Sequence, residues 1–196
     1  MTTKVPSVVA ASELPAKSGY EVVIGDALVS DAPAIALIGT KTFTTSFGFA
    51  VPPDDLAVFL AETYSAKAVE ADLSTSHETK INTFVARDET GKVLGFVQLV
   101  GGHTDPSIEG DPSTHAELRR LYVDTSAHGR GIGSKLIAAV EAKARADGVK
   151  TLWLTVWENA ADAQRLYYKL GYKKVGEAGF FLGGCTHNDH VLAKPL

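Results

Sequence analysis

The sequence predicts an α/β protein in which about four helices flank a single mixed sheet that is mostly antiparallel. Three observations support this prediction. Apolar residues alternate with polar ones in several short runs, and they recur at spacings of three and four in several longer runs. Between positions 115 and 157 the two patterns follow one another as strand, helix and strand, which is the order of a crossover between parallel strands.

The first third of the chain predicts one short strand and two or three helices. A β-branched run at 20–24 favours a strand. Asp31 is placed to be the N-cap of a first helix, with Pro33 in its first turn. A second helix is expected to begin in the proline- and aspartate-rich segment 51–55, and a third to cover 66–73. The residues expected to face inward are Ile35, Leu37, Ile38 and Phe43 on the first helix, and Leu56, Phe59, Leu60 and Tyr64 on the second.

A hairpin and a crossover unit are expected next. Two strands at 82–87 and 93–100 are separated by DETGK, in which Gly91 can take a positive φ. The segment 101–114 is long and rich in glycine, proline and aspartate, so we expect it near the rim of a site. The remaining expected elements are a strand over 115–123, a helix over 132–147, a strand over 151–156, a helix over 160–170, and strands over 172–177 and 190–193.

Length and composition indicate one globular domain. The chain has 196 residues, of which 45% are hydrophobic and 21% charged. Residues 1–18 are small, polar and proline-containing, so we expect a flexible N-terminal segment ahead of a single domain at 19–196. No apolar run approaches the roughly 18 residues of a membrane span, and no signal-peptide pattern is present, so a cytoplasmic protein without a membrane partner is expected.

Charge and cysteine content exclude several function classes. A net charge of −4 with scattered Lys and Arg argues against nucleic acid as a partner. Cys185 is the single cysteine, and although it forms Cys-x-His-x-x-His with His187 and His190, a closed metal site normally needs a fourth ligand, so we expect no metal. The segment 51–79 carries six acidic residues against Lys67 alone. That field could attract a cationic substrate, but a solvated helix face is the more ordinary explanation.

The stretch HGRGIGSKL, from His128 to Leu136, indicates an anion site. Gly129, Gly131 and Gly133 alternate with other residues directly before a helix whose Ile132, Leu136, Val140 and Ala144 share one face and whose end is marked by Gly148. First-turn amides of a helix lack internal partners and carry the positive end of its dipole, so a glycine loop there can hold a phosphate against the backbone. The glycine spacing fits neither the dinucleotide fingerprint nor the Walker A loop.

The longer segment LRRLYVDTSAHGRGIGSKL resembles motif A of the GCN5-related N-acetyltransferase (GNAT) superfamily, in which Gln/Arg-x-x-Gly-x-Gly/Ala binds the pyrophosphate of acetyl-CoA. The segment LWLTVWENAADAQRLYYKLGYKKVGE resembles the following strand and the LYxKLGF helix of that superfamily. A narrower resemblance, to the PaiA-type spermidine/spermine acetyltransferases, lies in TFTTSFGFAVPPDDLAVFLAETYS, LWLTVWEN and FFLGGCTHNDHVL. Two positions depart from the pattern: His128 replaces Gln or Arg, and Ala160 stands where an asparagine is usual, with Asn159 just before it.

The resemblance implies a GNAT fold and a set of residues that bind acetyl-CoA. The strands at 115–123 and 150–157 would splay apart, and the pantetheine arm would pair with exposed backbone in the gap between them. No metal is required by this chemistry. The residues implied for acetyl-CoA are Leu121, Tyr122 and Val123 through their backbone, His128, Gly129, Arg130, Gly131, Ile132, Gly133 and Ser134 around the phosphates, Asn159 at the pantetheine arm and Lys169 at the nucleotide phosphate.

The resemblance also implies direct attack of an amine on the thioester. Tyr167, at the tyrosine of the LYxKLGF helix, is the expected general acid. Glu117 is the candidate base, and strand alternation places it on one sheet face with Arg119, Leu121 and Val123. Arg119 could equally pair with Glu117 and make its role structural. The turn that contains Asp189 is expected to line the acceptor pocket, with Trp157 as core or pocket wall.

Three functions therefore stay open at the level of sequence. The favoured one is acetyl-CoA-dependent acetylation of a small-molecule primary amine, with polyamines preferred because of the PaiA-type resemblance. The enzyme alternative is a protein or peptide N-terminal acetyltransferase, which would need an open groove. The third is a catalytically idle acetyl-CoA-binding module, which the departures at His128 and Ala160 favour. A homodimer is compatible with each of them.

Overall fold

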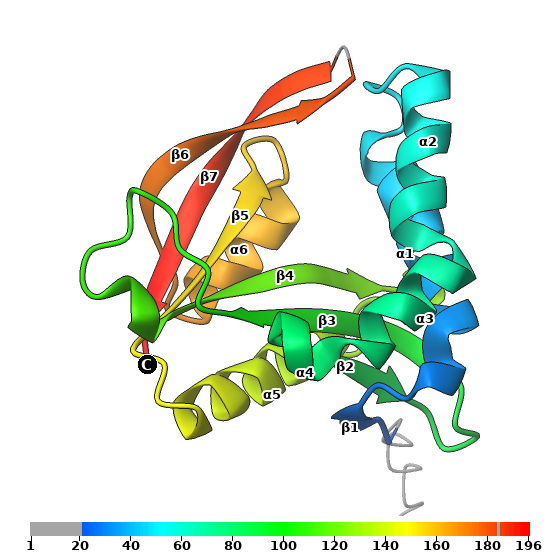
Figure 1. The fold of residues 1–196 in the computed structure, drawn as a ribbon, viewed down its shortest axis with the longest axis horizontal. Coiled ribbons are helices and arrows are strands. Elements are labelled where there is room, and N and C mark those ends of the chain that lie inside the picture. Colours follow the sequence, from blue (N-terminus) through cyan, green and yellow to red (C-terminus); the bar gives the residue numbers. More distant parts are fainter. Residues whose placement is uncertain (1–20, 184) are drawn as a thin grey trace, which may run out of the picture.

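The structure is a computed structural model that describes residues 21–183 and 185–196. Its centre is a seven-stranded sheet in the order β1-β2-β3-β4-β5-β7-β6, with helices on both faces (Figure 1). The strands are β1 Val23–Asp26, β2 Ile81–Arg87, β3 Val93–Gly101, β4 His115–Val123, β5 Thr151–Trp157, β6 Lys173–Leu182 and β7 Cys185–Pro195. The helices are α1 Ala32–Phe47, α2 Pro53–Tyr64, α3 Ala66–Ser74, α4 Ser76–Thr79, α5 Ile132–Ala146 and α6 Ala161–Lys169, with 3₁₀ turns at Val29–Asp31, Pro112–Thr114 and Thr125–Ala127.

The sheet opens between β4 and β5. These two strands are parallel and pair over three positions only, from His115 with Thr151 to Glu117 with Trp153. Beyond that point β4 runs with β1–β3 and β5 runs with the long β6–β7 hairpin, and the two halves diverge (Figure 1). The expected mixed sheet with one splayed parallel pair is therefore confirmed.

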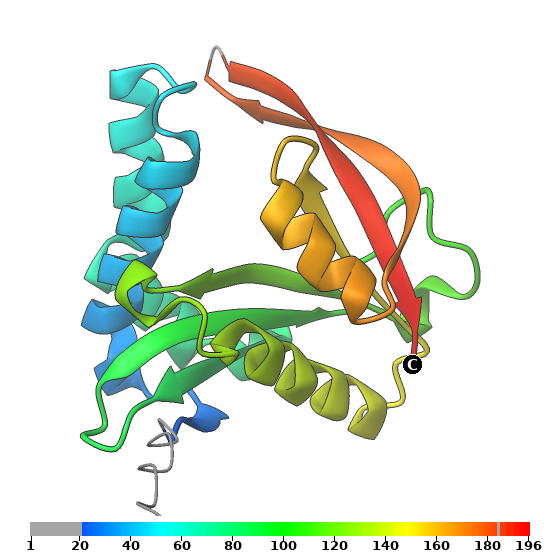
Figure 2. The same cartoon turned by 180° about the vertical axis from the view of Figure 1, so that it is seen from behind.

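Each face of the sheet has its own hydrophobic core. Helices α5 and α6 cover one face, as seen in Figure 2, where they lie in front of the strands. The stripe of Ile132, Leu136, Val140 and Ala144 on α5 is at most 1% exposed, which confirms the predicted face. Helices α1, α2 and α3 pack on the other face through Ile35, Ile38, Phe43, Tyr64 and Val69.

A bulge in β4 changes which side chains face which core. On β3, Gln98 pairs with Arg119 and Phe96 with Tyr122, so β4 has one more residue than β3 across this interval. Arg120 takes a φ of 55° there, in the left-handed region that non-glycine residues seldom adopt. Leu121 and Val123 consequently pack against the α5 core, whereas Tyr122 packs against the α1 core.

Several expectations require correction. Glu117 and Arg119 do not share a face with Leu121 and Val123, because the bulge at Arg120 breaks the alternation. Leu37 is 69% exposed, since the buried face of α1 passes through Ile35, Ile38 and Phe43 instead.

The boundaries of some elements also differ from expectation. The first strand begins at Val23 rather than at 20, and the last two strands are longer than predicted because they form one hairpin. The short helix α4 was not predicted. The N-terminal segment 1–18 lies outside the described residues. Among the described residues, no helix combines the length and the apolar character that a bilayer crossing requires.

Candidate active site

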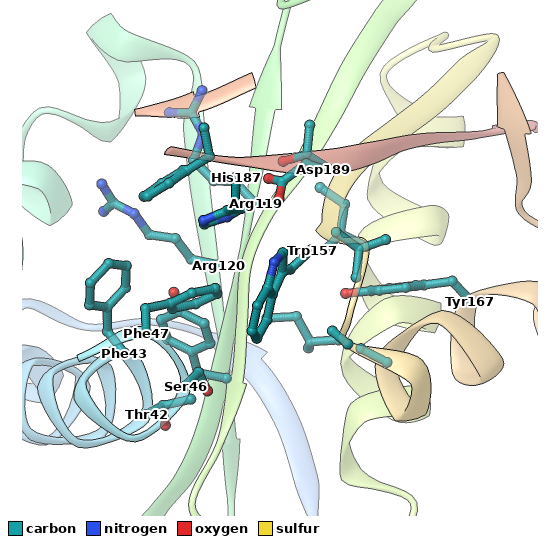
Figure 3. A pocket seen from close by; sticks show the side chains of 18 of the residues that line it. Thr42, Phe43, Ser46, Phe47, Arg119, Arg120, Trp157, Tyr167, His187 and Asp189 are labelled. Atoms are coloured by element: carbon teal, nitrogen blue, oxygen red, sulfur yellow. Dashed lines mark ion pairs between the residues drawn. The ribbon is translucent and has the colours of Figure 1, made fainter. Parts of the chain in front are cut away.

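Two cavities meet where β4 and β5 diverge. The larger has a volume of about 540 Å³ and lies among α1, β4, β5 and β7 (Figure 3). The second, of about 430 Å³, lies between the end of β4, the glycine loop and α6. The residues that line both are Thr42, Leu121, Tyr122, Ala163 and Tyr167. The two cavities are therefore neighbours that share one wall, and the larger is called the acceptor cavity and the smaller the loop cavity below.

The glycine loop forms an open cradle at the N-terminus of α5. Gly129 and Gly131 have φ values of 75° and 73°, and a Cβ atom at either position would meet no heavy atom within 4 Å. Gly131 is the N-cap of α5, and no side chain caps the amides of the first turn. A negatively charged group can therefore approach these amides closely, which is what a pyrophosphate requires. The implied acetyl-CoA phosphates fit this cradle, and Ile132, Gly133 and Ser134 line the same cavity.

The two basic side chains of the loop are tied to nearby carbonyl groups. The Nε2 atom of His128 lies 2.9 Å from the carbonyl oxygen of Val123, so it donates a proton there. In a neutral imidazole the other nitrogen, Nδ1, is then an acceptor, and His128 can offer a second donor only when it is protonated. Arg130 donates to the carbonyl oxygen of Ser126 at 3.1 Å. Both bonds hold the loop against the turn that follows β4.

The end of β4 offers backbone groups to the gap. Leu121, Tyr122 and Val123 line the loop cavity, and the β4–β5 ladder has already ended at Glu117. On the β5 side these three residues therefore have no pairing strand in the described sheet. Such an edge can accept an extended amide-bearing chain in the manner of an added strand.

Tyr167 occupies the wall that the two cavities share. It lies on α6, packs edge-on against Tyr172 at a centroid distance of 5.8 Å, and its ring points into the space between β4 and β5 (Figure 3). Burial raises the pKa of the Tyr167 hydroxyl well above its usual value of 10. The phenol therefore stays protonated near neutral pH and can serve as a proton donor.

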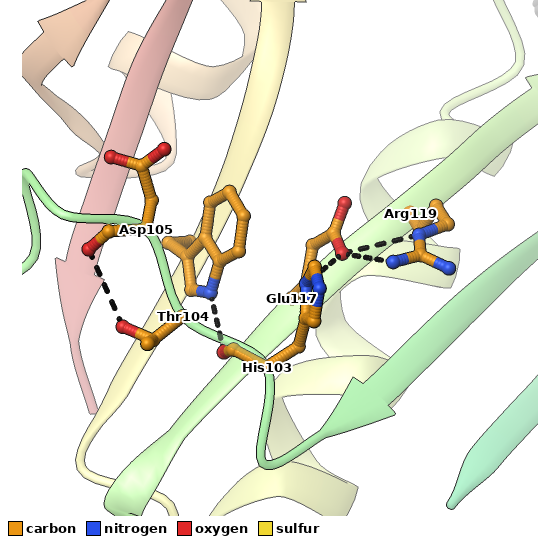
Figure 4. A network of polar contacts seen from close by, with 6 residues as sticks. His103, Thr104, Asp105, Glu117 and Arg119 are labelled. Atoms are coloured by element: carbon orange, nitrogen blue, oxygen red, sulfur yellow. Dashed lines mark hydrogen bonds and ion pairs between the residues drawn. The ribbon is translucent and has the colours of Figure 1, made fainter. Parts of the chain in front are cut away.

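Glu117 is held in an ion-pair network with Arg119 and His103 (Figure 4). Its Oε2 atom accepts from Arg119 Nε at 3.1 Å and Nη2 at 2.6 Å, and lies 2.8 Å from His103 Nδ1. The residue is 8% exposed and lines neither cavity. The His103 backbone is itself fixed by a 2.8 Å hydrogen bond from Trp153 Nε1.

The expectation that 101–114 forms the rim of the site is wrong. This loop packs at the end of the sheet where β4 and β5 are still paired, and Ile108 contacts the small cluster around Trp153. None of its residues lines the acceptor cavity or the loop cavity. Its contacts include His115, Glu117 and Trp153 on β4 and β5, so it supports the strands rather than the gap.

The far wall of the acceptor cavity is built from rings. The imidazole of His187 on β7 stacks on Phe180 at 4.4 Å and on Phe47 at 5.8 Å, and Trp157 lies 5.5 Å from His187. Trp157 is therefore pocket wall, one of the two roles expected from the sequence. The segments that bring these rings together are α1, the end of β5 and the β6–β7 hairpin.

Asp189 and two arginines supply the charges of the acceptor cavity. Asp189 Oδ1 lies 3.1 Å from His187 Nε2. Burial raises the pKa of the Asp189 carboxyl, and this effect is opposed by His187, Thr155 and His190. Arg119 and Arg120 line the same cavity, and Asp189 is the only carboxylate among the described residues that line it. Asp189 lines this cavity, but it does so from strand β7 and not from the expected turn.

Arg130, on the glycine loop, is implied for acetyl-CoA but lines neither cavity, and two further implied residues lie away from that loop. Asn159 is exposed on the turn after β5, and Lys169 is exposed at the last residue of α6. Neither lines the acceptor cavity or the loop cavity. Around Cys185, His187 and His190, as in the rest of the described chain, no group of three or more potential ligand side chains is arranged to hold a metal ion.

Of the cavity residues of α1, only Phe43 was expected from the sequence to face inward, and none was expected at a cavity. Thr42, Phe43, Ser46 and Phe47 line the acceptor cavity from adjacent turns of this helix. Ser46 and Phe47 follow Thr42 and Phe43 by four residues each, which places all four side chains on one face of a helix. This spacing is the signal that could have identified them. The cavity roles of Phe47 and Phe180 were likewise not predicted. In the sequence each has the pattern of an ordinary core residue, and only the placement of the β6–β7 hairpin opposite α1 brings them to one cavity.

Comparisons with known proteins agree with this arrangement. A sequence model described as the acetyltransferase (GNAT) family matches residues 49–172. An uncharacterised N-acetyltransferase of Lactobacillus delbrueckii subsp. lactis is 30% identical over 166 residues, which are 85% of this chain and 92% of that protein. The spermine/spermidine N(1)-acetyltransferase of Bacillus subtilis is 33% identical over 107 residues, 54% of this chain and 65% of that protein.

A solved structure has the same fold. The PaiA N-acetyltransferase of Thermoplasma acidophilum, crystallised in complex with coenzyme A, aligns with a TM-score of 0.69 at 18% identity. The alignment covers 90% of this chain and 99% of that one.

Proposed function

The chain belongs to the GNAT family of acetyltransferases and is an acetyl-CoA-dependent N-acetyltransferase, and we propose that it acetylates the primary amine of a small molecule bound in the acceptor cavity. The observation that carries this proposal is the meeting of two cavities at Tyr167. One offers backbone amides to an anionic chain, and the other is bounded by rings and by Asp189. The donor and the acceptor would therefore meet beside a protonated phenol.

The loop cavity would hold the donor. The amides at the start of α5 would bind the pyrophosphate, with His128, Gly129, Arg130, Gly131 and Ser134 around it, and the exposed edge of β4 would pair with the pantetheine arm. Acetyl-CoA supplies an acetyl group that is activated as a thioester. The proposed roles of Asn159 and Lys169 would require a donor that extends beyond the cavity walls, since both side chains lie outside them.

The chemical step would use two groups of the chain. Tyr167 is placed to protonate the departing sulfur, because its hydroxyl keeps its proton and lies on the shared wall. Glu117 could take a proton from the amine only through water, since it lines neither cavity. The rings of the acceptor cavity would limit the access of water to the thioester.

Polyamines are one acceptor class within this proposal. The Bacillus subtilis relative supports them, as does the PaiA-type resemblance of the sequence. Asp189 could receive one ammonium group of a polyamine. Further ammonium groups would lie near Arg119 and Arg120, which is unfavourable. The cytoplasmic location, the single domain at 19–196 and the homodimer stay predictions.

The test is the release of thiol from acetyl-CoA by the purified full chain with a panel of small amines, polyamines, amino acids and short peptides. Turnover with small amines supports the proposal. Turnover with peptides alone would instead favour the peptide N-terminal acetyltransferase. Measurable binding of coenzyme A with no turnover on any amine would favour the idle binding module.

A further inference from the structure

The charges of the acceptor cavity point to a narrower acceptor class than the family resemblance does. Resting on the proposed acetyl transfer, we propose that Asp189 binds the acceptor ammonium group and accepts its proton, and that the acceptor is a monoamine with an apolar, ring-bearing body. Asp189 would then be a catalytic residue and His187 a positioning residue.

Asp189 is the carboxylate that an amine in this cavity can reach. Glu117 lies outside the lining and is bound by Arg119 and His103, whereas Asp189 lies on the wall opposite β4 and faces the cavity together with Tyr167 (Figure 3). It pairs with Trp157 across the β5–β7 ladder, so it sits at the open end of the gap. An amine at Asp189 therefore lies inside the cavity that is also lined by Tyr167, the phenol proposed to protonate the leaving sulfur.

His187 fixes the orientation of this carboxylate. Its Nε2 atom lies 3.1 Å from Asp189 Oδ1, within ion-pair distance, and its ring is held by stacking on Phe180 and Phe47. The imidazole therefore has little freedom to turn. With His187 beside one carboxylate oxygen, the other oxygen stays available to an ammonium group, because a carboxylate has several lone pairs to share.

The balance of charge disfavours a polycation. The basic residues Arg119 and Arg120 line the cavity, and Asp189 is the single carboxylate among its described lining residues. Glu117 offsets Arg119, and Asp72, at 3.5 Å, offsets Arg120. One ammonium group can therefore be neutralised at Asp189. A second or third would be desolvated without a partner, next to a guanidinium group.

The rest of the cavity suits an apolar or aromatic body. Phe47, Trp157 and Phe180 form the wall beside His187, and Phe43 and Phe59 extend it along α1 and α2. Rings stack on such a wall with a gain beyond the area they bury. The same rings could also contact the ammonium group of a bound amine, which reinforces Asp189.

The protons of the reaction balance on these residues. The ammonium group gives one proton to the Asp189 carboxylate, from which it passes to solvent, and the freed lone pair of nitrogen forms the new bond to the acetyl carbon. The bond from that carbon to sulfur breaks, and the sulfur takes the proton of the Tyr167 hydroxyl. The second proton lost by nitrogen replaces the one that Tyr167 gave. The products are an amide, a free thiol and one proton released to solvent.

The first test compares acceptors. We would measure kcat/KM of the full chain for 2-phenylethylamine, hexylamine and spermidine at saturating acetyl-CoA. The expected order places the ring-bearing monoamine first and spermidine last, with a difference of at least about tenfold between them. A higher kcat/KM for spermidine would overturn this inference and leave the acetyl-transfer proposal intact. No turnover with any of the three, despite coenzyme A binding, would contradict both.

The second test uses variants. Asp189→Asn should lower kcat for 2-phenylethylamine by about a hundredfold or more and remove the acid limb of the pH profile, with coenzyme A binding retained as a check on folding. Glu62→Gln removes a carboxylate from an exposed position on α2 and is the matched control, with kcat within about twofold. Asp189→Asn with kcat near that of the native chain would overturn the proposal.

His187→Phe tests the positioning role, because it keeps a stacked ring and removes the ring nitrogen that lies 3.1 Å from Asp189 Oδ1. His187 and His190 on β7 lower the pKa of Asp189 in the native protein, and Arg119 on β4 and Tyr167 on α6 face the same cavity. Without His187 the acid limb of kcat/KM should move to higher pH. An unchanged pH profile would show that His187 is structural, and a vanished limb would assign the proton to His187 itself.

Discussion

Arg119 donates to Oε2 of Glu117 through both Nε and Nη2, at 3.1 and 2.6 Å. The two residues are neighbours on one face of β4, and the carboxylate is nearly buried while the guanidinium group reaches the acceptor cavity. The pair therefore brings a cation to the cavity wall together with its counter-charge. These contacts favour a structural role for Glu117, in which its carboxylate neutralises and orients Arg119.

Glu117→Gln should reduce stability more than it reduces catalysis. The amide cannot neutralise Arg119, and the loss of one partner from a largely buried ion pair should lower the free energy of unfolding by about 2 kcal/mol. Urea denaturation at neutral pH measures this. Glu89→Gln, on the exposed turn between β2 and β3, is the control and should change it by less than about 0.5 kcal/mol. Unchanged stability with a large fall in kcat would instead make Glu117 the base.

Much of the fold could be predicted from local patterns. The stripe on α5 and the glycine before it follow from residues near one another in the sequence, and the structure places Gly129, Gly131 and Gly133 beside the same cavity. The bulge at Arg120 could not be predicted in this way. Nothing in Leu118 to Tyr122 marks an extra residue, because the bulge is set by the pairing of β4 with β3. The bulge shifts the register by one residue, and Leu121 and Val123 therefore face α5, on the opposite face of the sheet from Glu117 and Arg119.

The candidate site was predictable on the donor side and only partly on the acceptor side. A phosphate cradle is built by consecutive residues, so its chemistry is visible in the sequence. The acceptor wall is assembled from Phe47, Trp157, Phe180 and His187, which are separated by up to most of the chain and meet only because α1 faces the β6–β7 hairpin. Sequence spacing carries no information about such a meeting.

Gly131→Ala should weaken donor binding. A residue with a side chain is strained by about 1 kcal/mol at a φ of 73°, and its Cβ would project into the open space of the loop cavity. We expect the KM for acetyl-CoA to rise about tenfold, since the backbone can no longer approach the phosphates as closely. Gly148→Ala is the matched control, because Gly148 also has a positive φ, of 79°, with free space around it, but at the other end of α5. Equal effects of both variants on KM would contradict the prediction.

Stability should fall steeply in alkaline solution. Burial raises the pKa of the hydroxyls of Tyr64, Tyr122, Tyr167 and Tyr172 above the value of 10 expected in the unfolded chain. The unfolded chain therefore loses these protons first, so the stabilisation is complete below pH 10 and is lost as the pH rises toward the folded pKa values. Each group contributes up to about 1.4 kcal/mol per pH unit in that window.

The measurement is the free energy of unfolding in urea between about pH 9 and pH 11. Lysines also titrate in this range, so the informative quantity is the difference in slope between the native chain and Tyr172→Phe. The variant should lose stability less steeply with pH. Identical slopes would mean that Tyr172 does not keep its proton in the folded state.

Tyr167→Phe should reduce turnover without weakening the binding of coenzyme A. The variant keeps the ring that packs against Tyr172 and removes only the hydroxyl on the shared wall of the two cavities. If that hydroxyl protonates the leaving sulfur, its loss should lower kcat by about a hundredfold. The binding of coenzyme A, followed by calorimetry, should stay within about twofold, because the phosphate cradle and the edge of β4 are unchanged.

Tyr168→Phe provides the matched control for this effect. Tyr168 is the next residue on α6, is 44% exposed and lines neither cavity, so its kcat should equal that of the native chain. The raised pKa of Tyr167 adds a second criterion, since a phenol that keeps its proton should produce no alkaline limb in the kcat profile of the native chain below pH 10. If Tyr167→Phe and Tyr168→Phe have the same kcat, the proton must reach sulfur from another donor, and the shared wall would serve only to position the two substrates.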